Sequence, residues 1–255
     1  MWIVKNFIKA ILIIALCVGV VFAFHYITVK LALWVSTPNV LVTKSSLVQP
    51  SNRATTHEKV TGMLTNIIAS KSNIVRKQWD NSKIDKVSMI IHSGYERTGL
   101  HPLTALAIIS HESGFNNNVH HKNIKCDSNN KCWVDSVDYY LTQQNSKQAA
   151  NRYYSVKNKV SRGKYKQEIV EILRPRVSGG YSHEKLRDPV LNIALMYQAV
   201  EECVQLHKRR GASENRMILC YNTPAYSVTA RGSRLERIPY VREVLRHRES
   251  LKSIV

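Results

Sequence analysis

The chain has 255 residues, with 37 Lys and Arg against 18 Asp and Glu, which gives a formal net charge of +19. Its length suits one domain of ordinary size plus accessory segments, and its charge attracts polyanions such as nucleic acid, anionic lipid or an acidic cell-wall polymer. A nucleic-acid partner is not favoured, because no binding module is recognisable and the longest basic run is only His207-Lys208-Arg209-Arg210.

An apolar segment near the N-terminus, residues 10–29, carries no charged side chain. In a helix that rises about 1.5 Å per residue, twenty such residues span the hydrocarbon layer of a bilayer. Lys5 and Lys9 precede the segment, which favours a cytoplasmic N-terminus and an exported remainder. A signal peptide cleaved after Ala23 is the alternative, but apolar residues continue well beyond it. We therefore expect residues 1–35 to form a cytoplasmic stub and an uncleaved transmembrane anchor.

A linker region, residues 36–83, follows the anchor. Residues 36–53 are rich in Ser, Thr, Asn and Pro, a composition typical of a tether. Thr55 and Glu58 fit a capping box, and hydrophobic residues then recur at helical spacing. We expect an amphipathic helix over about 57–79 that docks on the domain or on a partner.

The core domain, residues 84–255, is expected to be mainly α-helical. Its first helix begins near Ile84 and ends at Gly99, and Pro102 suits the first turn of the next helix. Asp188, with proline directly after it, provides a cap and a first helical residue for a later helix. The C-terminal helices are predicted over about 189–208, 213–221 and 239–251.

One acidic residue, Glu112, ends the aliphatic stretch of the second core helix. At helical spacing it shares the core-facing side with Ala105, Ile108 and Ile109. Burial against aliphatic carbon disfavours the ionised carboxylate and raises its pKa, which keeps a general acid protonated near neutral pH. Glu112 is therefore the first candidate for a catalytic residue.

Residues 117–160 are rich in Asn and Lys and predict no regular element, so we expect an irregular insertion in the helical domain. The stretch from Asp127 to Lys131 resembles a calcium loop. A lysine at a ligand position and the absence of the turn glycine argue against calcium.

Four of the five cysteines lie in the exported part and fall into two local pairs, Cys126 with Cys132 and Cys203 with Cys220. An even set of cysteines in an exported domain indicates disulfides. The second pair lies on either side of Gly211, where a helical hairpin would bring its members together. Zinc bound by the first pair with His120 or His121 is the alternative, although adjacent histidines suit a closed tetrahedral site poorly. We expect no metal or other cofactor.

Four sequence blocks occur in order over about residues 84–250. The first leads from Gly99-Leu100-His101-Pro102 into His111-Glu112-Ser113-Gly114-Phe115. The others are Leu186-Arg187-Asp188-Pro189-Val190-Leu191-Asn192-Ile193, Cys220-Tyr221-Asn222 and Tyr240-Val241-Arg242-Glu243-Val244-Leu245. In this order the blocks resemble the catalytic helix, the Asp-Pro-x-x-Asn-Ile block, the Tyr-Asn motif and the closing helix of the soluble lytic transglycosylases, a family related to goose-type lysozyme.

The resemblance implies a mainly α, lysozyme-like transglycosylase domain that cleaves the bond between N-acetylmuramic acid and N-acetylglucosamine in peptidoglycan without using water. Glu112 would protonate the bridging oxygen and then accept the proton of the muramyl 6-hydroxyl, which leaves a 1,6-anhydro end. Tyr221 and Asn222 would hold the acetamido group or orient Glu112. The family's groove-lining serine and glutamine fall at Ser161 and Gln167, which implies that the insertion precedes them.

Aromatic residues of the insertion offer a second kind of sugar contact. Trp133, Tyr139 and Tyr140 could stack against sugar faces, and a packing role is as consistent with the sequence. His111 points about 100° away from Glu112 on a helix and is not expected to be its catalytic partner.

Three other functions remain open at this stage. Asp127, Asp135 or Asp138 would supply the second carboxylate of a hydrolytic lysozyme. Thr223-Pro224, which replaces the family's Ala-Gly, favours a catalytically inactive, membrane-tethered scaffold that binds peptidoglycan. A basic accessory protein that binds nucleic acid is the third.

These features predict a single-pass protein of the inner membrane with its C-terminal domain in the periplasm. Its partners would be the glycan strands of peptidoglycan and the membrane itself. The resemblance to the lytic transglycosylases implies that the tethered enzyme would serve a secretion, conjugation or phage-entry apparatus.

Overall fold

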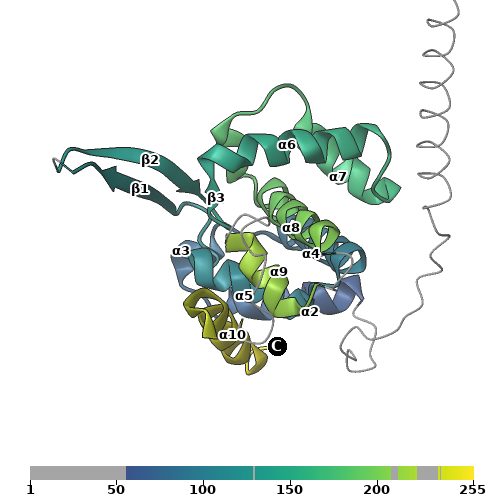
Figure 1. The fold of residues 1–255 in the computed structure, drawn as a ribbon. Helices are drawn as coiled ribbons and strands as arrows, with labels where there is room; N and C mark the ends of the chain where they lie inside the picture. The colour runs from purple at the N-terminus through teal and green to yellow at the C-terminus, as the bar shows by residue number, and fades with distance from the viewer. Residues whose placement is uncertain (1–55, 129, 208–211, 223–234, 236) are drawn as a thin grey trace, which may run out of the picture. The chain divides into compact units, whose positions relative to one another are not determined.

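The computed structural model describes residues 56–128, 130–207, 212–222, 235 and 237–255, and most of them lie in helices, as predicted (Figure 1). The helices are α2 (His57–Ala69), α3 (Asn73–Arg76), α4 (Asn81–Thr98), α5 (Pro102–Ser113), α6 (Ser146–Ser161), α7 (Gln167–Val177), the 3₁₀ turn η1 (His183–Arg187), α8 (Pro189–Leu206), α9 (Glu214–Asn222) and α10 (Pro239–Lys252). The strands are β1 (His120–Cys126), β2 (Cys132–Tyr139) and β3 (Gln144–Asn145), which form one antiparallel sheet in that order.

The predicted stub, anchor and tether lie outside the described residues. Within the described part of the chain, no helix combines the length and the apolar character needed to cross a bilayer.

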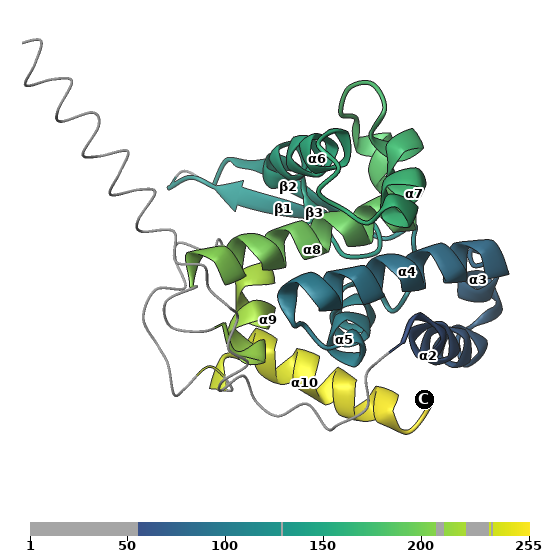
Figure 2. The same ribbon diagram turned by 90° about the vertical axis from the view of Figure 1, so that its right-hand side faces the viewer.

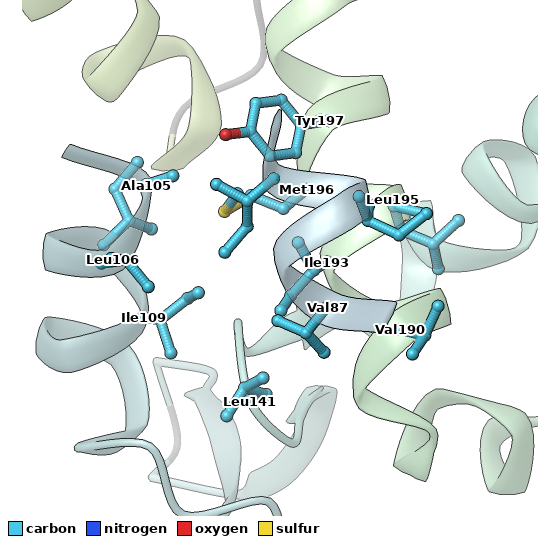
Figure 3. Close-up of a cluster of buried hydrophobic side chains, with 14 of the residues drawn as sticks. Val87, Ala105, Leu106, Ile109, Leu141, Val190, Ile193, Leu195, Met196 and Tyr197 are labelled. Carbon is cyan, nitrogen blue, oxygen red and sulfur yellow. The ribbon is translucent and has the colours of Figure 1, made fainter. Parts of the chain in front are cut away.

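Two helices, α4 and α8, lie side by side at the centre of the domain (Figure 2). Gly94 permits this close approach, because a Cβ at that position would collide with the ring of Tyr197 on α8. Helices α6 and α7 lie on one side of the pair, and α2, α5 and α10 lie on the other. Figure 3 shows the buried side chains that fill the centre, among them Val87, Leu106 and Ile193.

The predicted helix over 57–79 is divided into two shorter ones, so its single-helix form was wrong. Ser70 ends α2, and its hydroxyl donates to the carbonyl of Ile67 at 2.7 Å. The side chain of Thr56 caps α2 through the N–H of Lys59. The apolar face of α2 packs into the same core as α4, so this segment docks on the domain.

Helix α5 begins where the sequence predicts, at Pro102. His101 caps it through the N–H of Leu103 at 3.2 Å, Pro102 is its first residue, and Gly114 ends it at a φ of 59°. Every residue from Pro102 to Ser110 is buried, so α5 is enclosed on all sides until its last turn. The chain then turns sharply, because Phe115 also adopts a left-handed φ of 70°.

The insertion at residues 117–160 is regular, and the prediction of irregular structure was wrong. It consists of the β1–β2 hairpin, the short strand β3 and the helix α6. In β1 and the outer half of β2 nearly every residue is exposed. The strands therefore lack the alternation of apolar and polar residues by which a half-buried strand is recognised.

The C-terminal helices agree with their prediction. Asp188 caps α8 by accepting from the N–H groups of Val190 at 2.8 Å and Leu191 at 3.2 Å. Both predicted disulfides are formed, Cys203–Cys220 between α8 and α9 and Cys126–Cys132 across the end of the hairpin.

Candidate active site

Glu112 lies in the last turn of α5, and its side chain is partly buried. The residues predicted to share its face are fully buried: Ala105, Ile108 and Ile109. Burial raises the pKa of Glu112 from its ordinary 4.5 to about 7, a hydrogen bond from Tyr240 opposes this rise, and the charge of Asp138 adds to it. The carboxyl is therefore partly protonated at neutral pH, so it can both give and accept a proton.

Tyr240, in the first turn of α10, donates a hydrogen bond from its hydroxyl to Oε1 of Glu112 at 2.5 Å. The ring of His111 packs edge-on against that of Tyr240, with centroids 5.1 Å apart. Farther along the same helix pair, Oγ of Ser110 and Nδ1 of His247 lie 3.0 Å apart. Burial and the charge of Glu112 raise the pKa of Tyr240 well above 10.0, so its hydroxyl remains a donor.

Tyr221 approaches the same site from α9. Its hydroxyl donates to the carbonyl of Thr142 and accepts from Nε2 of Gln144 at 3.3 Å. Burial raises the pKa of Tyr221 above its ordinary value, and the nearby charge of Glu112 raises it further. Arg152, which is also buried, donates to Oε1 of Gln144 at 3.2 Å. The charge of Glu112 thus acts on Tyr221, and the Tyr221 hydroxyl holds residues 142–144 in place.

Hydrogen bonds with α5 and with α8 hold the segment between β2 and β3. Ser113, directly after Glu112, donates to the carbonyl of Leu141 at 2.7 Å. Asn192 of α8 is fully buried, and its Oδ1 accepts from the N–H of Thr142 at 2.8 Å and from its hydroxyl at 2.5 Å. Two residues of the segment adopt positive φ, Tyr140 at 61° and Gln143 at 47°. Non-glycine residues rarely adopt this conformation, so it depends on these anchors.

Asp138 is the one of the three candidate second carboxylates whose charge acts on Glu112. Its own carboxylate accepts from Nδ2 of Asn123 at 2.9 Å and from Nδ2 of Asn145 at 2.7 Å. The other two candidates are engaged along the hairpin, Asp135 by Lys125 and Lys147 and Asp127 by the N–H of Lys131.

The predicted substrate-binding residues Asn222, Ser161 and Gln167 are exposed. Asn222 is the last residue of α9 and borders residues outside the described part. Ser161 and Gln167 form hydrogen bonds within α6 and α7, at 3.0 Å and 3.2 Å respectively. Among the described residues, no hydrogen bond joins either of them to the network around Glu112.

Four residues of this network were not predicted as site residues: Thr142, Gln144, Asn192 and Tyr240. Asn192 and Tyr240 lie in two of the sequence blocks that carry the resemblance, which is the signal by which they could be found. Thr142 and Gln144 lie in the short polar run after Leu141. A run of uncharged polar residues directly after a hydrophobic one is too common to identify a site by itself.

The described cysteines are occupied by disulfides, which excludes the zinc alternative at Cys126 and Cys132 in this oxidised form. The ligand atoms of Cys203, His207 and Cys220 lie within 4.8 Å of one another. The two sulfurs are bonded to each other, however, and offer no thiolate to a metal.

Searches with protein-family models, among curated proteins and among solved structures found no match to this chain.

Proposed function

We propose that this protein is a peptidoglycan lytic transglycosylase in which Glu112 serves first as general acid and then as general base. The observation that carries the proposal is the placement of this carboxyl, which lies partly buried in the last turn of α5 and accepts a hydrogen bond from Tyr240 at 2.5 Å. Burial raises its pKa to about 7, which suits both roles at neutral pH. The four sequence blocks support the same family, and they contain Glu112, Tyr221, Asn192 and Tyr240.

The proposed reaction needs one carboxyl group and no water. Protonated Glu112 gives its proton to the bridging oxygen, and the bond from that oxygen to C1 of the muramyl sugar breaks. The resulting carboxylate accepts the proton of the muramyl 6-hydroxyl while that oxygen closes on C1. The new bond forms the 1,6-anhydro ring, and Glu112 regains its proton. The acetamido group of the substrate stabilises positive charge at C1, as in other substrate-assisted glycosidases.

Tyr240 adjusts this cycle through its hydrogen bond to Glu112. The bond stabilises the carboxylate and therefore opposes the effect of burial on the pKa. Without the tyrosine, the pKa of Glu112 would rise further, and its carboxyl would stay protonated up to a higher pH. We assign Tyr240 as a positioning residue and Tyr221 as the support of the neighbouring segment.

A hydrolytic lysozyme is the second candidate function, because the charge of Asp138 acts on Glu112. A hydrolase would use Asp138 to activate a water molecule or to attack C1. Two amide groups already donate to this carboxylate, from Asn123 and Asn145. These hydrogen bonds favour a structural role for Asp138, in which it joins β1 and β3. The transglycosylase therefore remains the first proposal.

We further propose that the enzyme is anchored in the inner membrane, acts on the periplasmic wall and serves a secretion, conjugation or phage-entry apparatus. The apolar segment at residues 10–29 supports the anchor. The net charge of +19 supports attraction to an anionic wall.

The test is digestion of purified sacculi by the full chain, with mass analysis of the released muropeptides. Anhydro-muramyl products are expected from the parent protein, and Glu112→Gln should lower their rate of release at least about a hundredfold. Glu249→Gln, which removes an exposed glutamate of α10, is the matched control and should leave the rate unchanged.

The alternatives give different products. Reducing ends, with Asp138→Asn as damaging as Glu112→Gln, would identify a hydrolase. Absence of any release by the folded, sacculus-bound protein would favour the scaffold.

A further inference from the structure

The β1–β2 hairpin extends away from the helices, and its two faces differ in chemistry (Figure 1). Residues paired directly across antiparallel strands point to the same face of a sheet. One face carries the pairs His121 with Asp138, Asn123 with Ser136 and Lys125 with Trp133. The other carries the pairs His120 with Tyr139, Lys122 with Val137, Ile124 with Val134 and Cys126 with Cys132.

A β-bulge determines which face Trp133 joins. Strict alternation along β2 would place Trp133 and Asp138, five residues apart, on opposite faces. The register shifts between Asn123 and Ile124, and Asp135 has no partner of its own in the ladder. This extra residue returns Trp133 to the face of Asp138, and bulges commonly redirect side chains near functional sites in this way.

The inner end of the face with Trp133 is the pair of His121 with Asp138, next to β3. Asp138 lies there, and its charge acts on Glu112. Asn123 donates to both Asp138 and Ser136, at 2.9 Å and 3.1 Å, which ties the polar groups of this face together. At about 3.4 Å per residue, Trp133 lies roughly 15 Å farther out along the strand. The face therefore leads from Asp138, whose charge acts on Glu112, to an aromatic ring.

Trp133 is 48% exposed although it is the largest side chain of the hairpin. Lys125 stands opposite it, and an ion pair with Asp135 at 3.2 Å holds this lysine. A half-exposed indole beside amide and ammonium groups suits a ligand that has both apolar ring faces and many hydroxyls. A membrane-binding surface would instead need a continuous apolar face, which this side of the hairpin lacks.

We propose that the face formed by Asn123, Lys125 and Trp133 is a distal binding site for a glycan strand, with a sugar ring stacked on Trp133. This inference rests on the proposed function, because it takes the strand cut at Glu112 as its ligand. The hairpin holds the strand several sugars away from the cleaved bond. Trp133 consequently sets the preference for long strands over short fragments and takes no part in the chemistry.

The test measures binding of peptide-free glycan strands of graded length by calorimetry, with the full chain carrying Glu112→Gln so that nothing is cut. Adding Trp133→Ala should weaken binding of long strands about tenfold and leave short fragments unaffected. Trp133→Phe should restore most of the affinity, since it keeps an aromatic face. Tyr154→Ala, which removes an exposed aromatic residue of α6, is the matched control and should change nothing.

Equal affinity of the parent and Trp133→Ala for every length would overturn the distal site, while cleavage by the chain with native Glu112 would still support the proposed function. A parent that binds long strands but never cuts them would leave the distal site standing and sink the proposed activity. A parallel titration with anionic lipid vesicles identifies the other occupant. Loss of vesicle binding in Trp133→Ala, with glycan binding unchanged, would assign the indole to a membrane surface and overturn the proposal.

Discussion

The surroundings of Glu112 and the β1–β2 hairpin are built in opposite ways. Around Glu112, polar side chains are buried and partnered, as when Asn192 holds both the N–H and the hydroxyl of Thr142. On the hairpin, side chains such as Trp133 and Ile124 are exposed, and a disulfide closes the end of the two strands. The first region holds reacting groups in a fixed geometry, and the second presents a surface.

The contrast has an energetic consequence. A buried polar group that loses its partner destabilises the whole domain, because it is cut off from water as well. An exposed group that loses its partner is solvated instead. Substitutions near Glu112 should therefore change stability and chemistry together, whereas substitutions on the hairpin should change binding alone.

The largest stability difference should separate two asparagines. Asn192→Ala leaves the N–H of Thr142 and the carbonyls of Tyr139 and Leu186 without their partner, and should lower the free energy of unfolding by about 4 kcal/mol. Asn123→Ala, on the hairpin, should lower it by less than about 1 kcal/mol. Urea unfolding of both variants measures the difference, and equal losses would break the distinction between the two regions.

Glu112→Gln should stabilise the domain, and only at higher pH. Because the folded pKa of about 7 lies above the ordinary 4.5, the folded protein binds more protons than the unfolded chain between these values. Stability is therefore lost as pH rises from 4.5 to about 7, and the loss is complete above that. The amide of Glu112→Gln does not titrate and avoids this loss. The free energy of unfolding of the variant should therefore exceed that of the parent by about 3 kcal/mol at pH 8 and equal it at pH 4.

Unfolding curves at both pH values test this prediction. Glu249→Gln, at an exposed position, is the control and should show no such gain. An equal gain in the free energy of unfolding at both pH values would mean that the pKa of Glu112 is not raised by burial.

Tyr240→Phe should produce the smallest shift. Its hydrogen bond lowers the pKa of Glu112, so its loss should move the alkaline limb of the activity profile upward by about one pH unit. The parent activity should fall as pH rises through about 7, because the acid loses its proton there. Rates measured across this range give the shift, and Tyr154→Phe is the control. A downward shift would contradict the assigned role of Tyr240.

Features set by neighbouring residues could be predicted from the sequence. Pro102 and Gly114 limit α5, and Asp188 with Pro189 begins α8, because caps and first-turn prolines act within a few residues. The buried face of Glu112 followed from helical spacing alone. The disulfide pairs followed from their proximity in the chain.

Features set by distant residues could not. Tyr240 meets Glu112 across 128 residues, and Tyr221 meets Thr142 across 79. The hairpin escaped prediction because β1 and the outer half of β2 are exposed on both faces and show no alternation. The division between α2 and α3 falls at Ser70, whose hydroxyl donates to the carbonyl of Ile67, and the helical spacing on either side does not reveal it.

The most direct test of the central claim is digestion of sacculi by the full chain in water labelled with heavy oxygen. If Glu112 accepts the proton of the muramyl 6-hydroxyl while that oxygen closes on C1, the new ends contain no oxygen from water. The products should then be unlabelled anhydro-muropeptides, absent with Glu112→Gln. One heavy oxygen at each new reducing end would show that water attacks C1, and would contradict the single-carboxylate mechanism.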